Sequence, residues 1–231
     1  MTGAMSWRRC AIEFAVPIPP RRQKMKSSGR IPASLLSSSL LIESEMNNPE
    51  ALETLLHQAR KYAEFSMRNI GHVPPTMLAM TPEGTLTFLP DGLEDEKAKT
   101  SFANTARMIC VGYGATAVVM ILESWATFAK QGKRLDDTSP SEAMDRKEFV
   151  VLMGETAGKK TTEFLPILRT DAGGFFGFGE FDSSGLEGFQ GRFAEMLPPI
   201  KPDKQMREMA QMLLQAMGVT KNLLQPKHGR N

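Results

Sequence analysis

The ten residues TAVVMILESW, at positions 116–125, decide which fold class this sequence predicts. The segment holds four β-branched residues, a type that favours strands: Thr116, Val118, Val119 and Ile121. Gly112 and Gly114 precede it, and each makes a continuing helix about 1 kcal/mol less favourable than alanine would. Both alternating faces of the segment are apolar, as in a central strand that is covered on both sides. We therefore predict a buried strand at the centre of a sheet.

Apolar periodicity and turn residues predict the elements on either side of this strand. Before it come a helix over 48–70, a hairpin over 76–90 and a helix over 91–114. After it come strands at 148–155, 161–170 and 174–181, a short helix at 184–197 and a terminal helix at 201–217. The predicted fold is α+β, with a mostly antiparallel sheet of five to six strands flanked by helices, in the order α-ββ-α-ββββ-αα.

The first 45 residues differ from the rest, with seven basic residues against three acidic ones and no acid between Phe14 and Ile42. This composition fits a disordered basic tail, a transit peptide, or an over-extended start with Met46 as the natural one. We favour the tail and the over-extended start over targeting. We expect residues 1–46 to be an extension, 47–218 a single domain and 219–231 a disordered tail.

The composition excludes several classes of function. A net charge of +2 gives no overall electrostatic case for binding nucleic acid, and no apolar run approaches the length of a membrane span. Cys10 and Cys110 offer neither a disulfide framework nor a zinc spacing, which fits a reducing, cytoplasmic setting. His57, His72 and His228 are scattered. We expect neither a metal nor a cofactor.

The stretch TDAGGFFGFGEFD, at positions 170–182, looks most like a site. Its glycines lack the spacing of a dinucleotide fingerprint, and no Lys followed by Ser or Thr completes a phosphate loop. As a strand after a TDAGG turn, it would place Phe175, Gly177, Gly179 and Phe181 on one face. This trench can receive a core helix, a ligand or a partner, and a helix is the commoner occupant. Pro166, which lacks an amide donor, predicts an edge or a bulge in the preceding strand.

A second cluster is expected at one end of the sheet if 116–126 and 147–154 pair as antiparallel neighbours. It contains Glu123, Trp125, Asp145, Arg146 and Glu148. A charge on a central strand needs a partner, so Arg146 is expected to pair with Glu123. The alternative is a carboxylate site for acid–base chemistry, formed by Glu123, Asp145 and Arg146, in a small-ligand-binding or hydrolytic enzyme.

Two further features favour packing over chemistry. Cys110 lies near a helix end without a histidine at a motif spacing, and we interpret it as a small buried hydrophobe. The terminal helix carries an apolar stripe: Met206, Met209, Ala210, Leu213 and Met217. Such a stripe usually packs into a core, and methionine also suits adaptable partner surfaces.

The predicted order of elements resembles the profilin-like group, which includes roadblock-type and PAS-type domains. Members of that group serve as dimeric scaffolds or small-ligand sensors, so this resemblance implies binding. The segments ILESWATF and PSEAMDRKEFVVLMGE also resemble hypothetical bacterial proteins carried on mobile elements, over about Met77 to Asp182. That second resemblance implies a bacterial accessory protein and transfers no catalytic role.

The sequence thus predicts a non-enzymatic, cytoplasmic bacterial protein that acts by protein–protein binding or self-association. The predicted binding residues are Trp125 and the phenylalanine–glycine strand, and a homodimer is one expected form.

Overall fold

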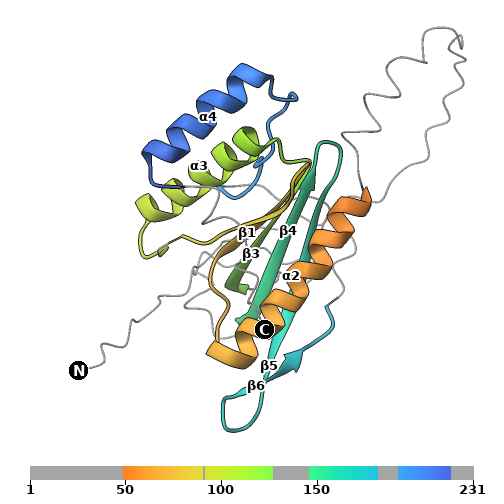
Figure 1. The fold of residues 1–231 in the computed structure, drawn as a ribbon. Helices are drawn as coiled ribbons and strands as arrows, with labels where there is room; N and C mark the ends of the chain where they lie inside the picture. Colours follow the sequence, from red (N-terminus) through yellow and green to blue (C-terminus); the bar gives the residue numbers. More distant parts are fainter. Residues whose placement is uncertain (1–48, 91, 127–145, 182–191, 220–231) are drawn as a thin grey trace, which may run out of the picture.

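A computed structural model describes residues 49–90, 92–126, 146–181 and 192–219 of the chain. In these residues three helices flank a six-stranded antiparallel sheet with the order β2-β1-β3-β4-β5-β6 (Figure 1). This confirms the predicted α+β class, the strand count and the order of the strands along the chain. The predicted extension over residues 1–46, the first residue of the helix predicted over 48–70, and residues 220–231 lie outside the described residues. None of the described helices is long and apolar enough to cross a bilayer.

The centre of the sheet is formed by β3 (Ala117–Ala126) and β4 (Lys147–Thr156). The two strands pair along their whole length, because Ala117 lies opposite Thr156 and Ala126 lies opposite Lys147. The expected central strand is therefore present, and its two faces belong to two separate apolar clusters.

Shorter strands extend the sheet on both sides of this pair. On one side β1 (Thr76–Thr81) pairs with β3 and with the edge strand β2 (Gly84–Phe88). On the other side β5 (Lys160–Arg169) pairs with β4 and with the edge strand β6 (Phe175–Phe178).

One face of the sheet is covered by α2 (Pro49–Ile70). Its buried side chains recur at helical spacing, as the sequence predicts: Leu52, Leu55, Leu56, Ala59, Ala63 and Met67. They pack on the side chains of β3 and β4 that lie on this face of the sheet, among them Val119, Ile121, Val150 and Leu152.

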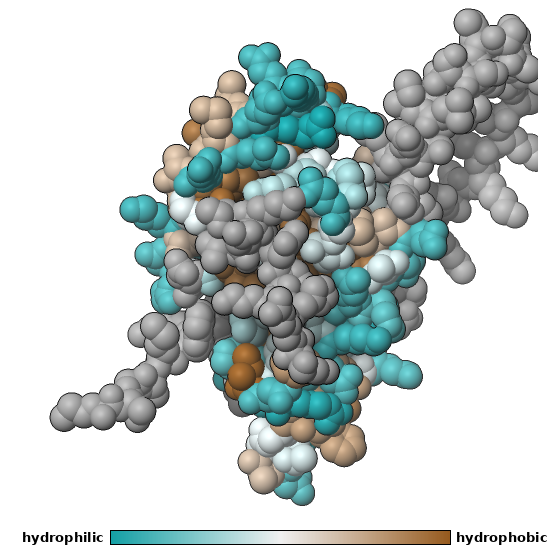
Figure 2. Space-filling model, in the orientation of Figure 1, coloured by the Kyte–Doolittle hydropathy of each residue, from teal (hydrophilic) through white to brown (hydrophobic). Residues whose placement is uncertain are grey.

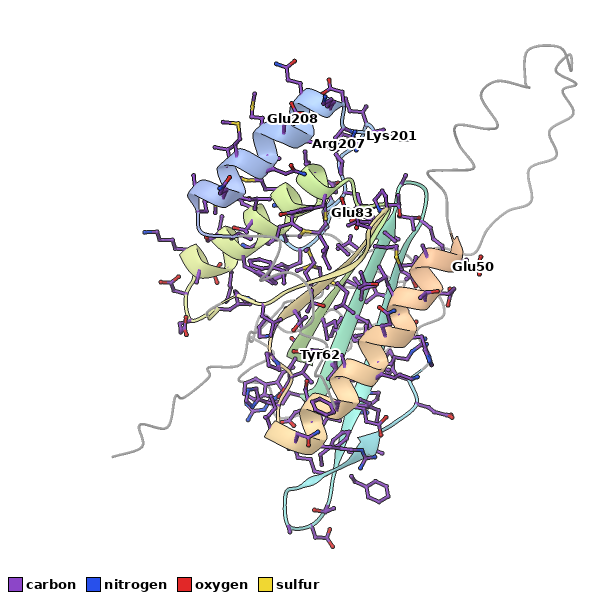
Figure 3. The ribbon with its side chains drawn as sticks, viewed as in Figure 1. Glu50, Tyr62, Glu83, Lys201, Arg207 and Glu208 are labelled. Carbon is purple, nitrogen blue, oxygen red and sulfur yellow. The ribbon has the colours of Figure 1, made fainter. Side chains whose placement is uncertain are left out.

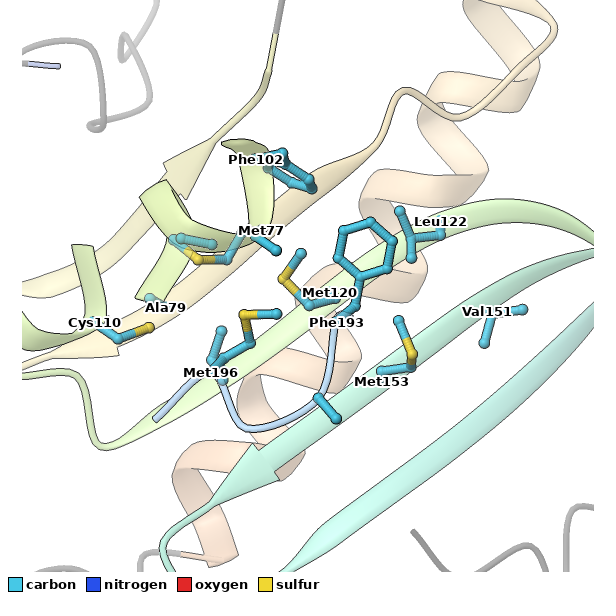
Figure 4. Packing of buried hydrophobic residues seen from close by; sticks show 14 of the residues in the cluster. Met77, Ala79, Phe102, Cys110, Met120, Leu122, Val151, Met153, Phe193 and Met196 are labelled. Atoms are coloured by element: carbon cyan, nitrogen blue, oxygen red, sulfur yellow. The ribbon is translucent and has the colours of Figure 1, made fainter. Parts of the chain in front are cut away.

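The opposite face is covered by α3 (Glu96–Tyr113) and by residues 192–197. Asp95 caps α3 by accepting a hydrogen bond from the Ala98 amide at 2.7 Å, and Gly114 ends it in the left-handed region at φ 62°. Phe102, Phe193 and Met196 meet methionines and aliphatic residues of the strands in this cluster (Figure 4).

Residues 192–197 form turns, so the described part of the helix predicted at 184–197 is not helical. The reason is a set of tertiary hydrogen bonds. The Arg107 guanidinium donates to the carbonyl oxygens of Arg192 at 2.6 Å, Ala194 at 2.9 Å and Glu195 at 3.1 Å. The buried carboxylate of Glu155 accepts from the Met196 amide at 3.1 Å. These partners satisfy backbone groups that a helix would have paired internally. Residues 182–191 lie outside the described residues.

The terminal helix α4 (Lys204–Ala216) stacks on α3 and forms the outermost layer (Figure 1). Asp203 caps it by accepting from the Met206 amide at 2.7 Å. Gly112 lets the helices approach closely, because a Cβ there would lie 3.4 Å from side-chain atoms of Ala210, Gln211 and Leu214. The Gln211 amide also donates to the Gly112 carbonyl at 2.7 Å.

Candidate interaction surface

The predicted cluster at the end of the central strands forms around Trp125 and Glu148, which are opposite each other on β3 and β4. The Trp125 ring nitrogen donates to one Glu148 oxygen at 3.4 Å, and Arg169 on β5 donates to the other at 2.8 Å. The Arg146 guanidinium stacks over the Trp125 ring, with its carbon 4.5 Å from the ring centroid. Glu148 thus has partners on both carboxylate oxygens, which is typical of a structural network.

Glu123 lies on the same strand as Trp125, but its carboxylate accepts a hydrogen bond from a backbone amide. One of its oxygens accepts a hydrogen bond from the Val73 amide at 2.9 Å, just before β1, and the residue is buried. The structure therefore gives Glu123 a role in fixing the chain between α2 and β1. Asp145, the third residue of the predicted carboxylate site, lies outside the described residues.

The phenylalanine–glycine strand is present as β6, after a turn in which Gly173 has φ 82°. In this turn the Thr170 carbonyl accepts a hydrogen bond from the Gly173 amide, and the Thr170 hydroxyl accepts one from the Gly174 amide. The predicted alternation of its side chains is wrong. The register shifts between Leu168 and Arg169, so that Gly177 faces Leu168 and Phe175 faces Arg169.

Because Phe176 is an extra residue in the pairing with β5, the aromatic rings of this stretch lie on opposite faces of the sheet. Phe175 and Phe178 join the cluster under α2, with ring centroids 5.0 Å apart. Phe181 joins the opposite cluster, with its ring centroid 5.5 Å from that of Phe149. Phe176 itself is 69% exposed.

The two glycines of the predicted trench, Gly177 and Gly179, therefore have different surroundings. A Cβ at Gly177 would meet no atom within 4 Å, whereas a Cβ at Gly179 would touch Pro166 and Leu168 at 3.4 Å. Pro166 lies on β5, which is not an edge strand, and the irregularity falls after it at Leu168 and Arg169. The carbonyl of Pro166 accepts from the Gly179 amide at 2.8 Å, so its missing donor faces the segment just after the end of β6 and not the central strand β4.

The predicted apolar stripe of α4 packs into the core only at Ala210, and its other four members are exposed. The buried residues of α4 are Ala210 and Leu214, which face α3. Five other apolar side chains are exposed, and we call them the α4 apolar face: Met206 (39%), Met209 (56%), Met212 (71%), Leu213 (50%) and Met217 (52%). Hydrophobic colour gathers on the left-hand edge of α4 in Figure 2, and sulfur atoms project there away from α3 in Figure 3.

A groove of about 710 Å³ lies at the C-terminal end of this face. It runs between the end of β2 and α3, and its apolar lining includes Phe88, Leu89, Phe102 and Val219. Met217 belongs both to the groove and to the α4 apolar face, so the two form one continuous surface.

Charges beside this surface hold the loop at residue 192 against the start of α3. Hydrogen bonds from Arg192 and Lys99 hold the pKa of the Glu96 carboxyl down at about 2. Deeper in the same layer, burial raises the pKa of the Cys110 thiol to about 12, helped by the nearby Glu155 carboxylate and opposed by Arg107. A thiol in that state is not a nucleophile, in agreement with its interpretation as a small core residue.

Within the described ranges, no group of three or more His, Cys, Asp and Glu residues is placed to hold a metal ion. The two family resemblances and the binding roles of Trp125 and the β6 residues stay predictions. No protein-family model, no curated protein and no solved structure matches this chain.

Proposed function

We propose that this chain is a non-enzymatic interaction protein that binds a protein partner, or another copy of itself, through the α4 apolar face. The observation that supports this is the exposure of five apolar side chains on a helix that Ala210 and Leu214 already anchor. Contiguous apolar patches of about 300–600 Å² on a monomer are often functional. Methionine fills such surfaces well because its unbranched side chain adapts to a partner's shape.

The spacing of the face favours recognition by another helix. Met206, Met209, Leu213 and Met217 follow one another at intervals of three, four and four residues, which places them on one side of the helix. Anchors at this spacing are what amphipathic helices present to a groove or to a second helix. The exposed carboxylate of Glu208 lies on α4 outside this line, where it pairs with Lys204 at 3.8 Å.

We propose a bacterial cytoplasm as the setting. Cys110, on α3, is a free thiol in the apolar cluster between that helix and the sheet, a state that suits a reducing compartment. The bacterial assignment comes from the resemblance of residues 121–128 and 140–155 to mobile-element proteins.

Site-specific photo-crosslinking of the full chain tests the docking surface. A benzophenone amino acid at Met209 is expected to give a crosslinked product in living cells and in the purified protein or its complex. The matched control is the same amino acid at Phe176, which is at least as exposed but lies on β6. Crosslinking from position 209 but not from 176 supports the proposal. Equal yields at the two positions, or none at 209, would refute it.

A further inference from the structure

We infer that the α4 apolar face binds a second copy of this chain, with the two α4 helices antiparallel about a two-fold axis at the level of Gln211. The inference rests on the proposed function and names the partner. Three features support it: the spacing of the face, its lack of charge, and the exposed Ile200 at one end with the groove at the other.

The spacing makes the face complementary to itself. Met209 and Leu213 lie two residues before and two residues after Gln211. An antiparallel pair centred there sets Met209 of each copy against Leu213 of the other. Met206 and Met217, at the two ends of the face, then come near one another across the interface. A contact in which residue i meets j while j meets i is what a closed two-fold dimer requires.

The electrostatics favour an uncharged partner surface. The α4 apolar face has no charged member, and the charges of α4 lie elsewhere: Lys204 pairs with Glu208, and Arg207 lies beside Gly114. Figure 3 labels Arg207 and Glu208 on α4. Two copies of the face therefore meet without like charges opposed across the axis, which would otherwise weaken the pair.

The area of the face alone is small for a stable dimer. Five side chains exposed by 39% to 71% offer on the order of 500 Å² per copy, against roughly 800 Å² per partner in a standard interface. The groove at the C-terminal end of α4 adds further surface, part of it polar because Glu94, Ser101 and Thr105 also line it. Ile200, which precedes the N-terminal end of α4, is 65% exposed.

In the antiparallel arrangement, the end of α4 that carries Ile200 in one copy lies beside the end with the groove in the other copy. This arrangement brings the N-terminal end of one α4 to the C-terminal end of the other, where Phe88, Leu89 and Met217 line the groove. We assign Ile200 of each copy to the groove of the other. The two-fold axis makes this contact twice, so the dimer buries two isoleucines in addition to the helix pair.

Sedimentation equilibrium of the full chain tests the inference. The wild type at about 100 µM is expected at twice the 25.5 kDa of one chain. The double variant Met209→Lys/Leu213→Lys is expected to raise the dissociation constant at least about 100-fold, because it sets like charges against each other across the axis. The control Phe176→Lys places the same charge on an exposed side chain of β6 and is expected to leave the dimer intact.

Charge complementation separates a lost contact from a misfolded chain. The variant Met209→Glu/Leu213→Glu is also expected to be monomeric alone, and a mixture of the acidic and basic variants is expected to form the heterodimer. Failure of the mixture to associate, or a lysine variant that stays dimeric, would overturn the α4 pairing.

The same experiments distinguish this inference from the proposed function. A wild type that is monomeric at about 100 µM yet crosslinks from position 209 to a different protein overturns the dimer and leaves the proposed function standing. A monomeric wild type with no crosslinked product from position 209 overturns both.

Discussion

The two strand glycines Gly154 and Gly177 provide a matched test of the packing, because the same substitution to alanine should act in opposite directions. A Cβ at Gly154 would lie 2.8 Å from Leu52 Cδ1 and 3.0 Å from Thr161 Cγ2. Leu52 lies on α2, is fully buried between that helix and the sheet, and cannot move into solvent. A Cβ at Gly177 would meet no atom within 4 Å, and its φ lies outside the left-handed region.

The magnitudes follow from these contacts. Overpacking a filled core by one methyl group costs about 1–3 kcal/mol, and replacing glycine by alanine regains about 0.4–1 kcal/mol by restricting the unfolded chain. Gly154→Ala is therefore expected to lower the free energy of unfolding by about 1–2 kcal/mol. Gly177→Ala has only the second effect and is expected to raise it by about 0.4–1 kcal/mol.

Urea denaturation followed by circular dichroism measures both variants against the wild type at constant m-value. For a chain of this size, each kcal/mol corresponds to a change of about 2–4 °C in Tm. A Gly154→Ala variant as stable as the wild type would refute the close contact between β4 and α2. A destabilising Gly177→Ala would contradict the open space found at this position of β6.

Three more outcomes are expected. Glu123→Ala should lower the free energy of unfolding by about 1–3 kcal/mol in urea, because the Val73 amide loses its acceptor; an unchanged midpoint would contradict this. The Glu96 pKa of about 2, below its ordinary 4.5, means that its ion pair with Arg192 adds stability above pH 4.5. The stability difference between wild type and Glu96→Gln should therefore vanish as pH falls from 4.5 toward 2, and a difference that grows on acidification would refute the assignment. In a Cys10→Ser background, Cys110 should resist iodoacetamide at pH 8 when folded and react in urea, and fast reaction of the folded form would show that the thiol is not buried.

Local signals were enough to predict most of the fold. The β-branched run on β3, the turn at Gly173 and the helical spacing of α2 depend on neighbours in the sequence, and each element formed as expected. The loop at 192–197 could not be found in this way. Its shape depends on Arg107, which donates to carbonyl groups more than eighty positions away.

The candidate surface was only half predictable. Periodicity identified the apolar stripe of α4, but it does not say which residues a neighbouring helix will cover. The contact with α3 falls on Ala210 and Leu214, to one side of the methionines, because Gly112 leaves room for the helix at that point. The glycines of β6 indicate an irregular strand. The register shift that separates Phe175 from Phe181 could not be predicted, because it depends on how β6 pairs with β5.

The short, irregular β6 has a consequence for how the molecule behaves in a crowded solution. An open sheet exposes unpaired amide and carbonyl groups at each edge, and a long flat edge invites other chains to add strands and aggregate. Here one edge is four residues long and kinked by a register shift, and the other, β2, has five residues. Neither offers a template of useful length, so the sheet is protected against uncontrolled growth into fibres.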